Sequence, residues 1–361
     1  MKYVDEFCDE KICHNLTKKI AQVSNGQQIT FMEVCGTHTM AIFRYGIKSI
    51  LPTNIKLLSG PGCPVCVTPN SDIDKMIAYA RQEGVIVVTF GDMMKVPGST
   101  SSLSKERALG GDIRVVYSVS EAIRIAKGEP TKKVVFIGIG FETTAPSVGV
   151  SILEAEERKL SNYFVFCVHK TIPLAIKAIL DSGELKLDGL ILPGHVSTII
   201  GARAYEFIPR DYGVPCVVAG FEAVDIFQAI LMLTTQVRDS TPQIATQYTR
   251  SVKSNGNPKA IAIMDQVFEP TDSEWRGIGV IPNSGLKISP KYSKVDAEKN
   301  IDVEVEPSSE SPDCICGEIL RGVKTPHNCK LFGKACLPES PIGPCMVSSE
   351  GTCAAYYKYM I

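Results

Sequence analysis

The sequence lacks an excess of either charge, and it lacks any long apolar run. Its 361 residues include 38 Lys and Arg against 39 Asp and Glu, so no field favours a phosphate backbone, and we expect no nucleic-acid partner. No apolar stretch approaches the roughly 18 residues that a membrane-spanning helix needs. The charged start, MKYVDEFCDEKICHNLTKK, lacks the apolar segment of a secretory signal. We therefore expect a cytoplasmic protein with no membrane partner.

Two common cofactor fingerprints are missing as well. Neither GIGF at 138–141 nor GPGC at 60–63 continues into a Walker or a full Rossmann pattern, so nucleotide binding has little support. The three-cysteine spacing of many radical SAM enzymes is incomplete, because Ser59 stands where a cysteine would complete it with Cys63 and Cys66.

Cysteine, in contrast, is abundant and unevenly placed. Thirteen cysteines occur, and the last forty-eight residues hold six of them: Cys314, Cys316, Cys329, Cys336, Cys345 and Cys353. In the cytosol ordinary thiols stay reduced, so dense cysteine argues for metal or redox chemistry rather than structural disulfides. The odd count also argues against a fully paired disulfide framework.

The chain from residue 28 to about 240 alternates β-branched runs with helical patterns. This alternation predicts an α/β fold whose parallel sheets are covered on both faces. The expected strands are Ile29–Val34, Ile55–Leu58, Val85–Phe90, Ile113–Tyr117, Val134–Ile139, Phe164–Val168, Gly189–Leu192 and Cys216–Ala219. The expected helices lie near 71–83, 119–127, 146–160, 171–181 and 221–237.

Three pairs of segments predict an internal duplication. MEVCGTHTM at 32–40 pairs with IGIGFETTA at 137–145, LLSGPGCPVC at 57–66 with LILPGHVST at 190–198, and VVTFGD at 87–92 with VVAGFE at 217–222. The order matches although the spacings differ. We therefore predict two similar α/β domains, at 26–128 and 129–243. Their Gly-rich loops fall at the carboxyl ends of parallel strands, where such sheets place ligands.

The remaining residues, 1–25 and 244–361, are predicted to form a third, cysteine-rich domain. Residues 283–313 are rich in Ser, Pro, Lys and Glu and resemble an exposed connection. Residues 3–22 have the pattern of an amphipathic helix. Its apolar stripe, Val4, Cys8, Ile12, Leu16 and Ile20, makes Cys8 a buried side chain and Cys13 a surface thiol.

The terminal block offers six thiols, more than one cubane cluster needs. Cys314 and Cys316 point to the same side of an extended backbone and would crowd one cluster. We therefore expect four of the six cysteines to bind the cluster and the other two to form a pair that can oxidise. A zinc-stabilised knot is the alternative, but the paired Cys-x-x-Cys of zinc ribbons is absent here. The spacing of the six cysteines therefore favours an iron–sulfur cluster over a zinc site.

Two upstream cysteine motifs leave more than one interpretation open. Cys63 and Cys66, in a Gly- and Pro-rich loop after a strand, indicate thiol–disulfide exchange or a metal half-site rather than inert core. Cys35 and His38 could form a nucleophilic dyad, or the Cys35 thiolate could bind iron with an imidazole nearby.

Two further loops supply polar candidates. GFETTAP at 140–146 contains Glu142, Thr143 and Thr144, and PGHVS at 193–197 contains His195. The threonines are equally well explained as a helix cap. Glu142 and His195 are better placed to line a cleft between two domains.

Together CGTHT, GPGCPVC, GFETTAP, PGHVS and CMVSSEG resemble the HypD family of [NiFe]-hydrogenase maturation proteins, from about residue 28 to the C-terminus. The resemblance implies two similar α/β domains and a third, cluster-bearing domain. It also implies an accessory protein that, with the small chaperone HypC, holds an iron atom while two cyanides and a carbon monoxide are attached. The cyanide would arrive through HypE, supplied by HypF.

The family pattern assigns the cysteines. It places a [4Fe-4S] cluster on Cys314, Cys329, Cys336 and Cys353, and leaves Cys316 and Cys345 as a redox pair beside it. Cys63 and Cys66 match the family's second thiol pair, and Cys35, with His38 adjacent, matches its iron-carrying residue. No family role falls on Cys8, Cys13, Cys167 or Cys216.

The resemblance thus implies a redox-active assembly scaffold for an Fe(II) that carries cyanide and carbon monoxide, rather than a conventional turnover enzyme. Electrons would pass from the cluster through Cys316 and Cys345 to Cys63 and Cys66, and on to iron at Cys35. The alternatives are a stand-alone iron–sulfur thiol–disulfide oxidoreductase and a zinc-stabilised docking scaffold.

Overall fold

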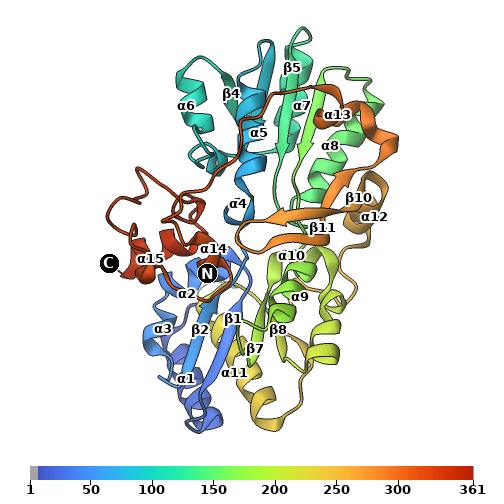
Figure 1. Cartoon of the computed structure of the whole chain (residues 1–361). Helices are drawn as coiled ribbons and strands as arrows, with labels where there is room; N and C mark the ends of the chain where they lie inside the picture. The colour runs from blue at the N-terminus through green and yellow to red at the C-terminus, as the bar shows by residue number, and fades with distance from the viewer. Residues whose placement is uncertain (1–6, 361) are drawn as a thin grey trace.

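The computed structural model describes residues 7–360, whose strands form two parallel sheets and one antiparallel hairpin. Sheet A has the order β2-β1-β7-β8-β9 and sheet B the order β4-β3-β5-β6. In Figure 1 sheet A occupies the lower half, sheet B the upper half, and the hairpin crosses between them. The strands are β1 Ile29–Glu33, β2 Ile55–Ser59, β3 Val85–Thr89, β4 Asp112–Val115, β5 Lys133–Gly138, β6 Tyr163–Cys167, β7 Gly189–Pro193, β8 Cys216–Ala219, β9 Ile244–Thr246, β10 Phe268–Trp275 and β11 Gly279–Ile288.

Helices cover both faces of both sheets, as the strand–helix alternation predicts. The α-helices are α1 Glu10–Ser24, α2 Gly36–Arg44, α3 Ile47–Ile50, α4 Pro64–Val67, α5 Asn70–Ala80, α6 Leu103–Ala108, α7 Val119–Gly128, α8 Ala145–Glu157, α9 Ile172–Ser182, α10 Gly194–Ile200, α11 Ala223–Asp239, α12 Pro258–Val267, α13 Ala297–Asn300, α14 Cys316–Leu320 and α15 Thr352–Met360. Short 3-10 turns include η3 Ala202–Tyr205, η5 Pro290–Val295, η6 Pro326–Asn328 and η7 Pro344–Met346. No helix within 7–360 is long and apolar enough to cross a membrane.

All eight predicted strands and all five predicted helices are confirmed. Three strands were not predicted. β9 is three residues long, and β10, with the sequence FEPTDSEW, holds a proline and three acidic side chains that weaken the strand pattern. β11 pairs with β10 across seven registered residue pairs. The hairpin is therefore held by cross-strand pairing and by packing rather than by local propensity.

The two sheets are interleaved along the chain, and this corrects the predicted domain boundaries. Sheet A takes its strands from 29–59 and 189–246, whereas sheet B is built from 85–167. The boundaries at 26–128 and 129–243 are therefore wrong. Strand adjacency in a parallel sheet depends on long crossover connections, and no local pattern reports where a crossover lands.

The expectation of two similar α/β units is nevertheless confirmed at the level of topology. In each sheet the second strand along the chain lies at one edge, next to the first, which is followed by the third and the fourth. β1 of sheet A thus corresponds to β3 of sheet B. The motif pairing predicted instead that β1 corresponds to β5, and that assignment is wrong.

The cysteine-rich segment does not stand apart as an independent domain. The largest hydrophobic core joins Leu190 of sheet A, Phe166 of sheet B and Cys345 of the terminal block. Separate cores cover the outer faces, with α1 and α11 on sheet A and α7 and α8 on sheet B. β9 extends sheet A, so the predicted third-domain boundary at residue 244 is also wrong.

An extended strap, residues 301–313, carries the chain from sheet B to the terminal block (Figure 1). Ser308 donates to Asp74 over 2.6 Å, and the Ser99 hydroxyl donates to the Ser309 carbonyl and accepts from the Ser309 amide. Glu306 accepts from Arg81 over 2.9 Å. After the strap, α15 packs on α2 beside the end of β1. The terminal block is thereby brought back to the first motif of the chain.

Helix α1 begins at Glu10, with Asp9 as its N-cap, and packs on α11. It belongs with sheet A, so the assignment of residues 7–25 to the third domain is wrong. The helix buries Cys13 and Ile20 and leaves Cys8 exposed, the reverse of the predicted cysteine environments. Cys8 precedes the helix and so cannot share its stripe; the predicted stripe residue Val4 lies outside the described residues.

Two isoleucines of the predicted apolar stripe can test which face of α1 is buried. Ile20 is fully buried whereas Ile12 is 39% exposed. We expect Ile20→Ala to lower the free energy of unfolding by about 3 kcal/mol, because it leaves a cavity. Ile12→Ala should lower it by less than about 1 kcal/mol. Equal losses in urea unfolding of the two variants would contradict the observed helix face.

Candidate functional site

Cys35 lies directly after β1 and occupies the N-cap position of α2. Its backbone amide donates to Glu33 Oε2 over 2.9 Å, and Gly36 donates to the Gly62 carbonyl over 2.9 Å. A Cβ on Gly62 would stand 2.1 Å from the Cys35 nitrogen. Residue 62 must therefore be glycine for the loop after β2 to approach the loop after β1 this closely.

The Cys35 thiol is buried and surrounded by acids. Burial, the nearby Glu350 and Glu33 together raise the pKa of Cys35 to about 12, opposed by the backbone amides of His38 and Thr37, which point at the sulfur. The free thiol therefore keeps its proton at neutral pH. A bound metal cation reverses this preference, because coordination deprotonates a thiol outright.

Two acidic side chains lie beside Cys35 that the sequence motifs did not identify as candidate site residues. Glu33 is fully buried; burial raises its pKa to about 8 against hydrogen bonds from Thr39, Cys35 and Ser59, so it is largely protonated at neutral pH. Glu350, from the terminal block, accepts from the Thr37 hydroxyl over 2.6 Å. Both lie inside motifs noted for their cysteines, MEVCGTHTM and CMVSSEG.

Cys63 and Cys66 are disulfide-bonded at the start of α4, with Cα atoms 5.2 Å apart. Both are buried, and Cys63 follows directly on Gly62. The loop therefore places this pair against the backbone of Cys35. α4 also packs on η7, which contains Cys345. The Cys63–Cys66 helix thus contacts the terminal block through η7 and adjoins the Cys35 loop through Gly62.

The imidazoles of His38 and His195 both pack against the Phe221 ring. The ring centroids are 4.8 Å apart for His38 and 3.9 Å apart for His195. His38 Nε2 donates to the Gly220 carbonyl over 2.8 Å, and burial lowers the pKa of His38 to about 4. Desolvation also lowers the pKa of His195. Both rings are therefore neutral at physiological pH.

The predicted Cys35–His38 dyad is not assembled as a nucleophile–base pair. Among the hydrogen bonds of residues 7–360, none joins the His38 ring to the Cys35 sulfur; the backbone amide of His38 faces that sulfur instead. The carbonyl of Gly220 holds the ring. The structure therefore does not support the nucleophilic dyad. The other interpretation, in which the Cys35 thiolate binds iron, does not need His38 as a base.

Glu142, at the end of the loop after β5, is buried, and its Oε1 accepts from the Ile172 amide over 3.1 Å. Its other oxygen has no hydrogen-bond partner among residues 7–360. Thr143 is exposed. Thr144 precedes α8 but does not accept from helix amides; its hydroxyl donates to the Phe141 carbonyl over 3.3 Å. The capping alternative for the threonines is therefore wrong for Thr144.

All six terminal cysteines line one small cavity, together with Leu331, Phe332 and Met346. Within it, Cys316 Sγ lies 2.6 Å from Cys345 Sγ. The cysteines are Cys314, Cys316, Cys329, Cys336, Cys345 and Cys353. Hydrogen bonds with Cys314 and Cys345, aided by the Arg276 charge, lower the pKa of Cys316.

The donor set of this cavity fits an iron–sulfur cluster. It offers thiols and apolar side chains with no carboxylate, which suits soft metals rather than hard cations. Within 7–360 no three Cys, His, Asp or Glu side chains converge as ligands of a single ion. A cubane does not require such convergence, because each thiolate binds a different iron of the cluster. Cys314, Cys329, Cys336 and Cys353 would hold it.

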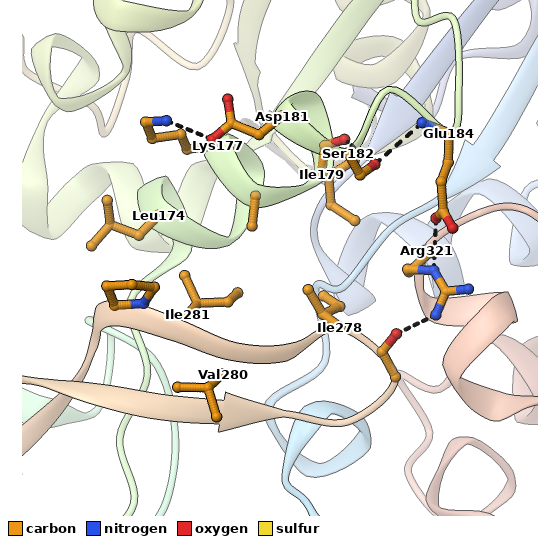
Figure 2. A pocket seen from close by; sticks show the side chains of 13 residues that line it. Leu174, Lys177, Ile179, Asp181, Ser182, Glu184, Ile278, Val280, Ile281 and Arg321 are labelled. Carbon is orange, nitrogen blue, oxygen red and sulfur yellow. Dashed lines mark hydrogen bonds and ion pairs between the residues drawn. The ribbon is translucent and has the colours of Figure 1, made fainter.

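A larger groove, of about 660 Å³, lies between α9 and the tip of the hairpin (Figure 2). Arg321 of the terminal block closes one end, where its guanidinium pairs with Glu184 over 2.8 Å and contacts the Gly277 carbonyl. Ile278 and Leu174 form its apolar walls. None of the predicted site residues lies here.

Comparison with known proteins decides the family. A family model described as HypD, "Hydrogenase formation hypA family", matches residues 11–360. The chain belongs to the HypD family. It is 48% identical to the hydrogenase maturation factor HypD of Azotobacter vinelandii, with 99% of this chain and 97% of that protein aligned. It is 42% identical to HypD of Escherichia coli K12, covering 99% and 98%. The predicted membership of the HypD family is confirmed, and with it a place in hydrogenase maturation.

A buried carboxyl of this HypD-family site predicts a measurable pH dependence. Burial raises the pKa of Glu142 from 4.5 to about 7. Between these values the folded chain keeps a proton that the unfolded chain has lost, so the free energy of unfolding falls as the pH rises through this window. Glu142→Gln keeps the acceptor for Ile172 but cannot titrate. Urea unfolding should show a shallower fall for the variant, by up to about 1.4 kcal/mol per pH unit; identical slopes would contradict it.

Proposed function

We propose that this chain is a cytoplasmic scaffold on which the Fe(CN)2CO group of [NiFe]-hydrogenases is assembled. In this proposal it works with HypC, and cyanide arrives from HypE, itself supplied by HypF. One observation carries the proposal: the six-cysteine cavity packs through η7 on the Cys63–Cys66 helix, and that helix adjoins Cys35. Family membership supports the same role.

Cys35 would hold the iron. Cyanide and carbon monoxide are strong-field ligands that favour low-spin Fe(II), and a thiolate is a suitable soft ligand for that ion. The backbone amides of His38 and Thr37 point at the sulfur and would stabilise its thiolate form. A second thiolate, supplied by HypC, would be the other protein ligand of the iron.

Burial reduces the charge carried by the titratable side chains of the Cys35, Glu142 and His38 motifs at neutral pH. Burial raises the pKa of Glu33 to about 8 and that of Glu142 to about 7, and it lowers the pKa of His38 to about 4. Neutral groups can donate or accept hydrogen bonds without placing a net charge against the iron. In such an environment the nitrogen atoms of the bound cyanides would act as hydrogen-bond acceptors.

The terminal cavity would hold the [4Fe-4S] cluster, which when bound supplies electrons one at a time. The thiols of Cys316 and Cys345 lie in contact and would collect two electrons as a dithiol. The depressed pKa of Cys316 favours its thiolate. This pair is the part of the cavity not needed for ligation.

The transfer to the second pair is an ordinary thiol–disulfide exchange. The Cys345 thiol, whose pKa is raised by its contact with Cys316, passes its proton to the adjoining Cys316 thiolate and attacks one sulfur of the Cys63–Cys66 disulfide. The other cysteine of that disulfide leaves as a thiolate and takes up a proton. Cys316 then attacks the Cys345 sulfur, which releases the second thiolate and closes a Cys316–Cys345 disulfide. Two electrons have moved to the pair beside Cys35. Because Cys63 and Cys66 are buried, an external protein disulfide is a poorer substrate for them.

The role of Cys35 is tested by infrared spectroscopy of the protein co-purified with HypC. Wild type should show carbon monoxide and cyanide stretching bands, and Cys35→Ala should abolish all of them because the iron has lost its ligand. Cys8→Ala, which removes an exposed thiol outside the site, should retain the bands. Bands of undiminished intensity in Cys35→Ala would remove Cys35 from this role.

A further inference from the structure

Arg276, in the turn between β10 and β11, is a buried arginine to which the proposed function gives no role. Only 5% of its surface is exposed. A charged side chain is almost never buried to this degree unless its donors are paired, so its partners indicate what it does. No motif in the sequence pointed to this residue. Figure 1 shows the turn that carries it beside α4.

The hydrogen bonds of Arg276 fix the far end of the disulfide helix. Its backbone amide donates to the Val67 carbonyl over 2.8 Å. Its guanidinium donates twice to the Thr68 carbonyl, from Nε over 3.1 Å and from Nη2 over 2.8 Å. Val67 is the last residue of α4 and Thr68 is its C-cap. Arg276 thus pairs carbonyls that a helix end leaves open, on the helix that begins with the Cys63–Cys66 disulfide.

The same turn contacts the terminal block. A Cβ on Gly277 would stand 2.1 Å from the Gly317 Cα, so these two backbones touch, and Gly317 directly follows Cys316 in α14. Arg276 Nη1 also donates to Glu310, over 2.5 Å, in the strap that leads to the terminal block. One turn therefore contacts the elements that carry both cysteine pairs.

We propose that Arg276 is a positioning residue for the transfer between these two pairs. Its hydrogen bonds to the Thr68 carbonyl hold α4 against η7, where Cys345 reaches the Cys63–Cys66 disulfide. This inference rests on the proposed function. No electron or proton passes through Arg276. Its effect is on geometry, because the attacking sulfur must meet the disulfide at contact distance, and a misplacement of about 1 Å can slow a reaction by about 100-fold.

Arg276→Met tests the proposal because it keeps a long side chain and removes every donor. The full-length, cluster-loaded protein is reduced with a one-electron donor that does not attack disulfides. The appearance of Cys63 and Cys66 thiols is followed by alkylation and mass spectrometry. We expect transfer in Arg276→Met to be slower by roughly 10- to 100-fold. Dithiothreitol should open the disulfide at least as fast as in wild type, since it does not use the terminal block.

Arg276→Lys separates hydrogen bonding from the filling of space. A lysine ammonium can donate to the Thr68 carbonyl but cannot form the paired bonds of a guanidinium. This variant should therefore recover part of the rate that Arg276→Met loses. Arg81→Met is the matched control. Arg81 also ties the strap, but its guanidinium pairs with Glu306 and Glu106 rather than with α4. Its transfer rate should equal that of wild type.

The outcomes separate the two levels of the argument. If the donor leaves Cys63–Cys66 closed in wild type, the relay of the proposed function is overturned, and this inference with it. A wild-type rate in Arg276→Met overturns the inference alone. So does a loss of cluster absorption in that variant, or a rate in Arg276→Lys no higher than in Arg276→Met, because either result assigns Arg276 a structural role. Slow transfer with intact cluster absorption, partly recovered by lysine, supports it.

Arg276→Lys also decides the question if Arg276→Met does not fold. It keeps the charge, so it should transfer a few-fold more slowly than wild type because it lacks the paired bonds. A wild-type rate in Arg276→Lys would then overturn the inference.

Discussion

The close approach of the Gly62 loop to Cys35 is the constraint on which the rest of the site depends. The amide of Gly36 donates to the Gly62 carbonyl, and a side chain at residue 62 would collide with the Cys35 backbone. This contact joins the carboxyl ends of β1 and β2, places Cys63 one residue from it, and leaves α4 free to meet η7. Without it, the disulfide pair and Cys35 would be separate features on two neighbouring strands.

Burial determines the electrostatics that follow. The terminal block covers Cys35 through Glu350 and α15, and the two sheets enclose Glu33, Glu142 and His38. In this enclosure desolvation keeps Glu33 largely protonated, leaves Glu142 about half protonated near pH 7, and keeps the imidazole of His38 neutral, so these groups offer hydrogen bonds with little charge. The same covering excludes water from the thiols. The fold thus gives Cys35 a buried environment with little charge.

The sequence allowed the strands, the helices and the cysteine motifs to be predicted because each depends on local pattern. β1 and β5 are recognisable from their β-branched runs, and Cys63 and Cys66 from their spacing. The interleaving of the sheets was not predictable, since it depends on which strand a crossover reaches. Glu33 was overlooked beside Cys35, although its motif was noted.

The central claim is that electrons reach the Cys35 site from the terminal block through Cys345. It is tested most directly by the thiol state of Cys63 and Cys66 after reduction with a one-electron donor that does not attack disulfides, read by differential alkylation and mass spectrometry. Wild type should show both thiols reduced. Cys345→Ser, with its cluster absorption retained, should keep the Cys63–Cys66 disulfide, while dithiothreitol should open it in both proteins. Equal reduction of Cys63 and Cys66 by the one-electron donor in Cys345→Ser would contradict the account.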